Sequence, residues 1–372
     1  MSIALERYSD AHRRRAALTH RLRRARLRVL ASAVLGATLV AGCGDQGMTA
    51  PSAGDSLKPS LRVVGAVATD LGTLGGAGSD AVAINAKSQV VGESATTSGN
   101  VHAFLWQRGH GIQDLGTLGG GFSQARGINS KGQVVGLSTT ISGQQHAFLW
   151  QSGQGMKDLG TLRGEFSLAN GINDKGQVVG YSGSSGQEHA FLWQSGRGMQ
   201  DLGTLGGGAS QANGINAEGQ VVGTSSTTSG DSHAFLWQSG QAMQDLGTLG
   251  GAISIASGIN TKGQVVGLSE TTGGQDHAFL WQRGAGMQDL GTLAGGGSDA
   301  VAINASGEVV GFSSTTSEPY HAFLWQPGRG MQALATLGGA FSQALGINTK
   351  GQVVGVSTTT TTSRQLHAVL WQ

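Results

Sequence analysis

The chain has 372 residues, of which 65 are glycine and only 12% are charged. Its net charge of +2 is unevenly distributed, because nine of the 24 basic residues but only two of the 22 acidic ones precede Cys43. The remaining 15 basic and 20 acidic residues leave the rest of the chain mildly acidic, which argues against a nucleic-acid partner. A single cysteine excludes an internal disulfide framework, so packing and hydrogen bonds must hold the fold.

The N-terminus has the pattern of an export signal. Residues 1–28 are rich in arginine, and residues 29–42 form an apolar run that is too short to span a bilayer but suits a signal-peptide core. The sequence Leu-Val-Ala-Gly-Cys, ending at Cys43, resembles the bacterial lipoprotein box. We therefore expect a lipoprotein-type signal peptide over 1–42, a lipid anchor on Cys43 and a flexible tether over 43–64. An ordinary secreted or inner-membrane-anchored protein is the alternative.

The anchor would place the protein outside the cytoplasm, on the bacterial cell envelope. By resemblance to lipoprotein sorting, Gly44 rather than aspartate behind the cysteine favours the outer membrane.

The pentapeptide His-Ala-Phe-Leu-Trp organises the rest of the chain. It occurs six times, followed by an altered seventh copy at 367–371, and it contains every tryptophan of the sequence. Successive copies begin 43 to 46 residues apart. The seven histidines are His102, His146, His189, His233, His277, His321 and His367.

Each repeat predicts four short antiparallel strands. Its apolar pieces are five to eight residues long, rich in Val, Phe and Trp, and separated by glycine-containing turns. Four strands per 40-odd residues are typical of a propeller blade, so we predict an all-β, seven-bladed propeller over 65–372. Small side chains such as Ala125 would face the crowded axis, and Phe148 and Trp150 would fill the wider gap farther out. A β-solenoid is the alternative.

The two ends of the repeat region complement each other. The last unit stops after its third strand, whereas the first unit is preceded by a spare fourth strand over 68–74. Pairing of this strand with 367–371 would complete the seventh blade and leave no open sheet edge.

The repeats resemble the HAF repeat of bacterial extracellular proteins. The resemblance covers essentially all of 65–372 and includes Gly-Ile-Asn, Gly-Gln-Val-Val-Gly and Asp-Leu-Gly-Thr-Leu around each His-Ala-Phe. At the level of the fold, the units also resemble kelch blades. The HAF resemblance implies export to the envelope and no particular chemistry. Departures are Val369 in place of Phe, and Ala333 and Ala335, which we assign to the seventh unit.

The repeated histidines predict a structural role and no metal. Neighbouring sheets lie about 10 Å apart, whereas zinc–nitrogen bonds are about 2.0–2.1 Å. We expect a buried histidine in each blade, bonded to the serine of Gly-x-Ser or the aspartate of Asp-Leu-Gly-Thr-Leu. Residues 75–83 fit a calcium-binding nonapeptide, but such nonapeptides need adjacent tandem copies, so no cofactor is predicted.

Candidate binding residues are those that break the repeat. The residue before each Gly-Ile-Asn or Ala-Ile-Asn would border the central channel. This residue is polar in units two to five and apolar in the other three. Arg163 and Glu165 replace glycines in the link that enters blade three, and Tyr320 lies in a variable loop before His321. The channel residues in order are Val82, Arg126, Asn170, Asn213, Ser257, Val301 and Leu345.

These features favour a monomeric binding module for a protein or glycan, attached to the membrane through its lipid alone. Local motifs of hydrolases, nucleotide-binding proteins and metalloenzymes are absent from the sequence. One alternative is an extracellular polymer hydrolase or lyase using carboxylates such as Glu165, Asp231 or Glu270. A structural envelope protein is the other.

Overall fold

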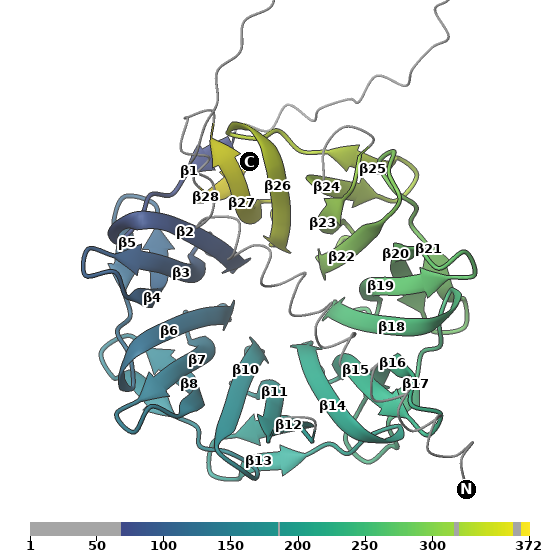
Figure 1. The fold of residues 1–372 in the computed structure, drawn as a ribbon, viewed down its shortest axis with the longest axis horizontal. Helices are drawn as coiled ribbons and strands as arrows, with labels where there is room; N and C mark the ends of the chain where they lie inside the picture. The colour runs from purple at the N-terminus through teal and green to yellow at the C-terminus, as the bar shows by residue number, and fades with distance from the viewer. Residues whose placement is uncertain (1–67, 185–186, 316–319, 360–365) are drawn as a thin grey trace, which may run out of the picture. The chain divides into compact units, whose positions relative to one another are not determined.

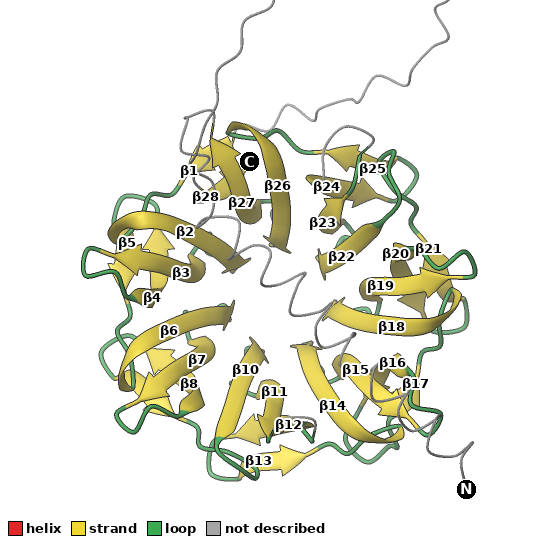
Figure 2. Ribbon diagram, viewed as in Figure 1, coloured by secondary structure: helices red, strands yellow, loops and turns green. Residues whose placement is uncertain are grey.

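The computed structural model describes residues 68–184, 187–315, 320–359 and 366–372, which lie within one compact unit, Leu61–Gln372. The predicted signal peptide, the tether and Cys43 lie outside the described residues. All regular structure in the described part is β-strand (Figure 2). That part contains no helix that could cross a membrane.

The strands form successive four-stranded antiparallel meanders, the blades, arranged around a centre (Figure 1). Within the described residues, blades one to six are β2–β5, β6–β9, β10–β13, β14–β17, β18–β21 and β22–β25. Blade seven combines β26, β27 and β28 with β1 from the other end of the chain.

Equivalent strands have similar bounds in every blade. The innermost strands are β2 (Gly75–Ile84), β6 (Gly119–Ile128), β10 (Phe166–Ile172), β14 (Gly206–Ile215), β18 (Gly250–Ile259), β22 (Ser298–Ile303) and β26 (Gly338–Ile347). The second strands are β3 (Val90–Thr96), β7 (Val134–Thr140), β11 (Val178–Gly183), β15 (Val221–Thr227), β19 (Val265–Thr271), β23 (Val309–Ser313) and β27 (Val353–Thr359).

The outer half of each blade carries the pentapeptide. The third strands are β4 (Val101–Gln107), β8 (Gln145–Gln151), β12 (His189–Gln194), β16 (Ser232–Trp237), β20 (Asp276–Gln282), β24 (His321–Gln326) and β28 (Leu366–Trp371). The fourth strands are β5 (Gly111–Asp114), β9 (Gly155–Asp158), β13 (Gly198–Asp201), β17 (Gln244–Asp245), β21 (Gly286–Asp289), β25 (Gly330–Ala333) and β1 (Ala68–Asp70). Ala333 therefore belongs to blade six, and its assignment to the seventh unit is wrong.

The core consists of layers between neighbouring blades. Side chains alternate along a strand, so the pentapeptide presents Ala and Leu on one face and Phe and Trp on the other. Between blades one and two, Ala103 and Leu105 of β4 pack in one cluster with Phe148 and Trp150 of β8 and with Ala125 of the innermost strand. The large side chains of one blade thus fill the space left by the small ones of its neighbour, as predicted.

The first and last strands of the described chain lie side by side. Residues Ala68, Thr69 and Asp70 pair antiparallel with Trp371, Leu370 and Val369. Leu71 continues the contact through a bond from its backbone N–H to the carbonyl of Ala368. The strand ends at Asp70, shorter than the predicted 68–74.

An asparagine belt links the innermost ends of the blades. In each blade the side chain of the Ile-Asn asparagine donates to the backbone carbonyl of the corresponding asparagine in the next blade. Its amide oxygen accepts backbone N–H groups of the following turn, so this buried amide is almost fully satisfied. The bond from Asn348 to the carbonyl of Asn85 joins the last blade to the first.

The two ends of the blades form two rims. The histidine rim carries the loops between second and third strands and the links from fourth strands to the next blade; in blade one these are 97–100 and 115–118. The opposite, asparagine rim carries the turns between first and second and between third and fourth strands, 85–89 and 108–110 in blade one. Pairing of Gly119 with Thr140 holds link and loop together at the histidine rim in blade two.

Candidate functional site

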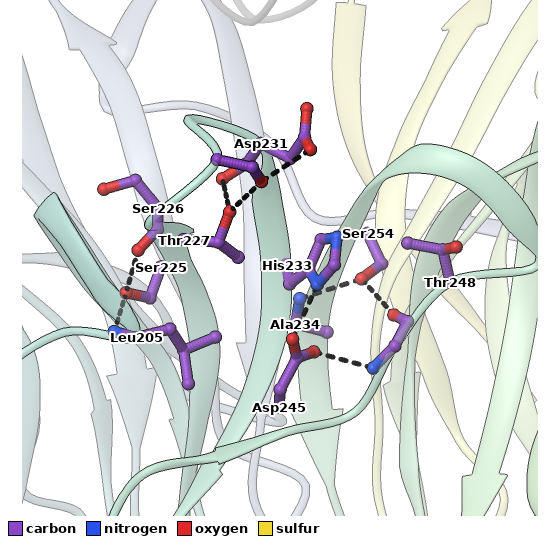
Figure 3. Close-up of polar contacts among 12 residues, drawn as sticks. Leu205, Ser225, Ser226, Thr227, Asp231, His233, Ala234, Asp245, Thr248 and Ser254 are labelled. Carbon is purple, nitrogen blue, oxygen red and sulfur yellow. Dashed lines mark hydrogen bonds and ion pairs between the residues drawn. The ribbon is translucent and has the colours of Figure 1, made fainter.

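The repeated histidine forms a hydrogen bond with the aspartate that ends the fourth strand. Figure 3 shows this arrangement in blade four, where Nδ1 of His233 lies 2.7 Å from the Asp245 carboxylate and that carboxylate accepts the N–H of Gly247. Five other blades have the same pair: His102–Asp114, His146–Asp158, His189–Asp201, His277–Asp289 and His367–Asp70.

One detail of the histidine prediction is wrong. The imidazoles are partly exposed rather than buried, because they lie at the rim end of their strands. Of the two predicted partners, the aspartate makes the contact. Ser138, an example of the serine, accepts the N–H of Leu118 and fixes the link instead. In blade six, Ala333 occupies the place of the aspartate, and no carboxylate of the described residues pairs with His321.

Blade three departs from the repeat at the histidine rim, and blade six shares the late start of its innermost strand. In five of the other blades the innermost strand begins at a Gly-Gly pair that runs close against the second strand. A Cβ on Gly120 would lie 2.2 Å from the Thr139 hydroxyl, so this approach requires glycine. In blade three, β10 begins only at Phe166, and the exposed Arg163 and Glu165 lie in a looser link before it.

The loosened link opens a cavity of about 260 Å³ at the rim of blade three. Its polar lining combines a guanidinium, an amide, an imidazole, a carboxylate and hydroxyls, and the remaining wall is Leu162 and glycines. The lining side chains that can form hydrogen bonds are Arg163, Ser182, Ser184, Gln187, His189 and Asp201.

The His–Asp pair of blade three is altered by this cavity. The His189 side chain is 34% exposed, whereas the other paired histidines are 15–22% exposed. Its Nδ1 lies within 3.0 Å of both oxygens of Asp201, so the aspartate fixes the orientation of the ring. One copy of a structural motif thus also lines an open cavity, together with the predicted candidate Arg163.

The polar channel candidates lie elsewhere and are engaged within the fold. Asn170 and Asn213 donate to the backbone carbonyls of Ala212 and Ala256 in the next blade. Arg126 donates through Nε and Nη2 to the side-chain oxygen of Gln124. A separate channel cavity of about 240 Å³ is lined mostly by Gly-Ile segments of the innermost strands, with Ser257 and Val301.

Tyr320 is 41% exposed in blade six, where its ring packs edge-on against Phe312 at 5.3 Å. The structure therefore brings Arg163 into the cavity of blade three and does not bring Arg126, Asn170, Asn213 or Tyr320 there.

Sequence reasoning missed a pair of acids between blades one and two. Asp80 of β2 and Glu93 of β3 are direct cross-strand partners. Burial raises the pKa of Asp80 to about 6. Burial and the neighbouring Asp80 raise the pKa of Glu93 to about 7, against the opposing effects of Arg126 and a hydrogen bond with Gln124. The signal was present, since blade one is the only repeat with an acid at both positions.

The carboxylates considered for catalysis are distributed over different blades. Asp231 accepts the hydroxyl of Ser229 in the loop of blade four, and Glu270 accepts the backbone N–H of Ala252 in blade five. Glu165 lies in the link of blade three. Among the described residues there is no group of three or more His, Cys, Asp or Glu side chains suited to a metal ion.

Comparisons with known proteins support the fold. The chain is similar to the β-propeller domain of the Trilobed protease from Pyrococcus furiosus, with 9% identity and a TM-score of 0.55 over 81% of this chain and 95% of that one. It is also similar to BP39L lectin from Burkholderia pseudomallei, with 8% identity and a TM-score of 0.50 over 83% and 96%. The chain folds as a β-propeller.

A third similarity, to TolB from Acinetobacter baumannii, has 11% identity and a TM-score of 0.46, and covers 65% of this chain and 62% of TolB. The match thus spans less than two thirds of that protein's length. No protein-family model and no curated protein matches the chain. At such low identities, the likenesses to the protease propeller domain and to the lectin establish architecture and carry no activity from one protein to another.

Proposed function

We propose that this propeller is an extracytoplasmic binding module that takes a glycan at the histidine rim of blade three. The supporting observation is the asymmetry of that rim. Six blades, blade three included, share a His–Asp pair that serves the fold. In blade three, however, the paired histidine also lines a cavity, beside Arg163. A repeated group supports every blade equally, whereas a ligand site requires a place where one blade differs.

The chemistry of the cavity suits a hydroxyl-rich ligand. Sugar hydroxyls both donate and accept hydrogen bonds, and the lining offers donors on Arg163 and Gln187 and acceptor oxygens on Asp201. The volume of about 260 Å³ fits one sugar unit rather than a chain, so the remainder of a glycan would lie along the rim. The fold is shared with a protein named as a lectin, which is compatible with this use.

The test is a glycan-array screen of the protein, followed by titration of the best ligand against Arg163→Ala/Glu165→Ala. We expect the double variant to bind at least ten-fold more weakly with an unchanged Tm, because both side chains are exposed. The control is Arg197→Ala, an exposed arginine in the same blade on the asparagine rim. Unaltered glycan binding by the double variant would place the site elsewhere, and binding of a protein but no glycan would reject the ligand class.

We further propose that Cys43 carries a lipid that holds the module on the cell envelope, through a signal peptide over 1–42 and a tether over 43–64. The support is the lipoprotein-box resemblance and the position of the chain's single cysteine directly after the apolar run. In cells given radioactive palmitate, the wild-type protein should be labelled and Cys43→Ala should not. Equal labelling of both proteins would contradict the anchor without affecting the binding proposal.

A further inference from the structure

Blade one differs from the others at the contact between its two inner strands. The difference concerns the cross-strand pair formed by the residue after the buried serine of the innermost strand and the residue after the glycine of Val-Val-Gly on the second strand. In blade one these are Asp80 and Glu93. The corresponding pairs elsewhere contain at most one acid: Gln124–Leu137, Leu168–Tyr181, Gln211–Thr224, Ile255–Leu268, Asp299–Phe312 and Gln343–Val356.

Like charges directly opposite each other destabilise an antiparallel pair, and burial increases the cost. The neighbouring blade supplies compensation through β6. Gln124 forms a side-chain hydrogen bond with Glu93, and Arg126 lies close enough to favour its ionised form. Arg126 in turn donates twice to Gln124, with Nη2 at 2.7 Å from the amide oxygen. Glu93, Gln124 and Arg126 therefore form a chain of polar contacts from blade one to blade two.

Two histidines are the other titratable groups on the adjoining strands, and His102 is adjacent to Ala103, the cross-strand partner of Glu93. The strands packed against β2 and β3 contribute the titratable residues His102 on β4 and His367 on β28. Both histidines are paired with aspartates at the histidine rim. The charge of the two buried acids is thus balanced either by a proton or by Arg126.

We propose that Asp80 and Glu93 share a proton and that Arg126 becomes the essential counter-charge when the proton leaves, so that the joint between blades one and two is a pH-dependent contact. In the protonated state the two carboxyl groups hydrogen-bond without repulsion, and Arg126 contributes little. In the ionised state two buried negative charges face each other, and the joint depends on the guanidinium. This device is separate from the glycan site and does not rest on it.

The direction of the pH effect follows from the raised pKa values of about 6 and about 7. The folded protein holds protons that the unfolded chain has lost above about pH 4.5, so the contribution of these acids to stability is complete below that pH. It declines as the pH rises through 6 and 7. The wild type should therefore lose stability across this range relative to a variant that cannot ionise there.

The test compares Tm at pH 5 and pH 8 for the wild type, Arg126→Gln and Glu93→Gln. Arg126→Gln should lower Tm at least twice as much at pH 8 as at pH 5. The Tm of the wild type relative to Glu93→Gln should fall between pH 5 and pH 8. The control is Asn213→Ala, at the channel position equivalent to Arg126, whose uncharged bond to Ala256 should contribute equally at both pH values.

A pH-independent loss in Arg126→Gln would mean that the side chain only fills space, and the proposal would be wrong. If Arg126→Gln does not fold at all, hydrogen exchange of the wild type and Glu93→Gln decides the question. After correction for the intrinsic exchange rate, β2, β3 and β6 of the wild type should lose protection between pH 5 and pH 8. Those strands should not do so in Glu93→Gln; identical profiles for the two proteins would overturn the proposal.

Discussion

The histidine of the repeated pentapeptide acts through the aspartate that it orients. His146, for example, holds Asp158, and the other oxygen of that carboxylate accepts the N–H of Gly160 at the start of the next link. The pair therefore fixes the point where the chain leaves the fourth strand. Both of its residues come from the same blade, so no neighbouring blade takes part. His321 lacks this partner because Ala333 faces its strand.

This contrast gives a prediction for single residues. His146→Ala should destabilise the protein by about 1 kcal/mol, the usual contribution of one hydrogen bond to stability. His321→Ala should cost clearly less, since no carboxylate of the described residues loses its partner. Urea unfolding at pH 7 with matched m-values measures both changes. Equal losses in the two variants would show that the imidazole contributes through packing alone.

At the scale of the strand, a β-bulge on the innermost strand makes glycine necessary at the last position of Gly-Gln-Val-Val-Gly. The innermost strand shifts register between Ala125 and Gly127, which brings the carbonyl of Gln124 towards the second strand. A Cβ on Gly136 would lie 1.9 Å from that oxygen. The same close approach occurs at this glycine in every blade, at Gly92, Gly180, Gly223, Gly267, Gly311 and Gly355.

Gly136→Ala should therefore destabilise the protein by about 3 kcal/mol or more, because backbone on both strands must move. The matched control is Gly153→Ala in the neighbouring outer turn. Gly153 has a φ of +77° with open space around its Cβ position, so only backbone strain of about 1–2 kcal/mol is expected. Urea unfolding compares the two variants, and a larger loss for Gly153→Ala would contradict the steric explanation.

Periodicity made the strands, their order and the small-to-large packing between blades predictable. The strands are short but recur with the same composition, so one unit defines the others, and the alternation of Ala-Leu with Phe-Trp assigns the two faces of β4 or β8. The bounds were less predictable. The Gly-Gly pairs look like loop residues in the sequence, but they begin the innermost strand. A glycine such as Gly120 lets this strand approach the second strand closely, and glycine content alone does not predict that approach.

The candidate site was only partly predictable, for a different physical reason. A break in the repeat, where a bulky residue replaces a glycine, singled out Arg163, and this residue lines the cavity of blade three. The cavity also required His189 and Asp201, which look like every other copy until the neighbouring link moves away from them. Asn170 and Asn213 break the repeat as well, yet their amides join neighbouring blades, because a polar side chain near the axis can reach a backbone carbonyl.

At the scale of the whole molecule, the pairing of β1 with β28 brings together residues about 300 positions apart. Asp70 forms with His367 the pair that other blades make internally. Leu71 is 6% exposed and packs in one cluster with Ala81, Phe104 and Leu370. A short N-terminal segment thus supplies a side-chain hydrogen bond, backbone hydrogen bonds and an apolar contact to the other end of the chain.

Deletion of residues 65–74 should remove all of these contacts at once. Loss of the buried Leu71 alone would cost about 2 kcal/mol, and loss of the strand pairing and of the Asp70–His367 hydrogen bond adds to it. We expect a clearly lower Tm and, because the edge of β28 becomes free to pair with another chain, dimers in size-exclusion chromatography. Deletion of 55–64 shortens the chain by the same number of residues and should leave both properties unchanged. An unaltered Tm after deletion of 65–74 would mean that the other three strands hold the last blade without β1, and that closure by the N-terminus contributes nothing to stability.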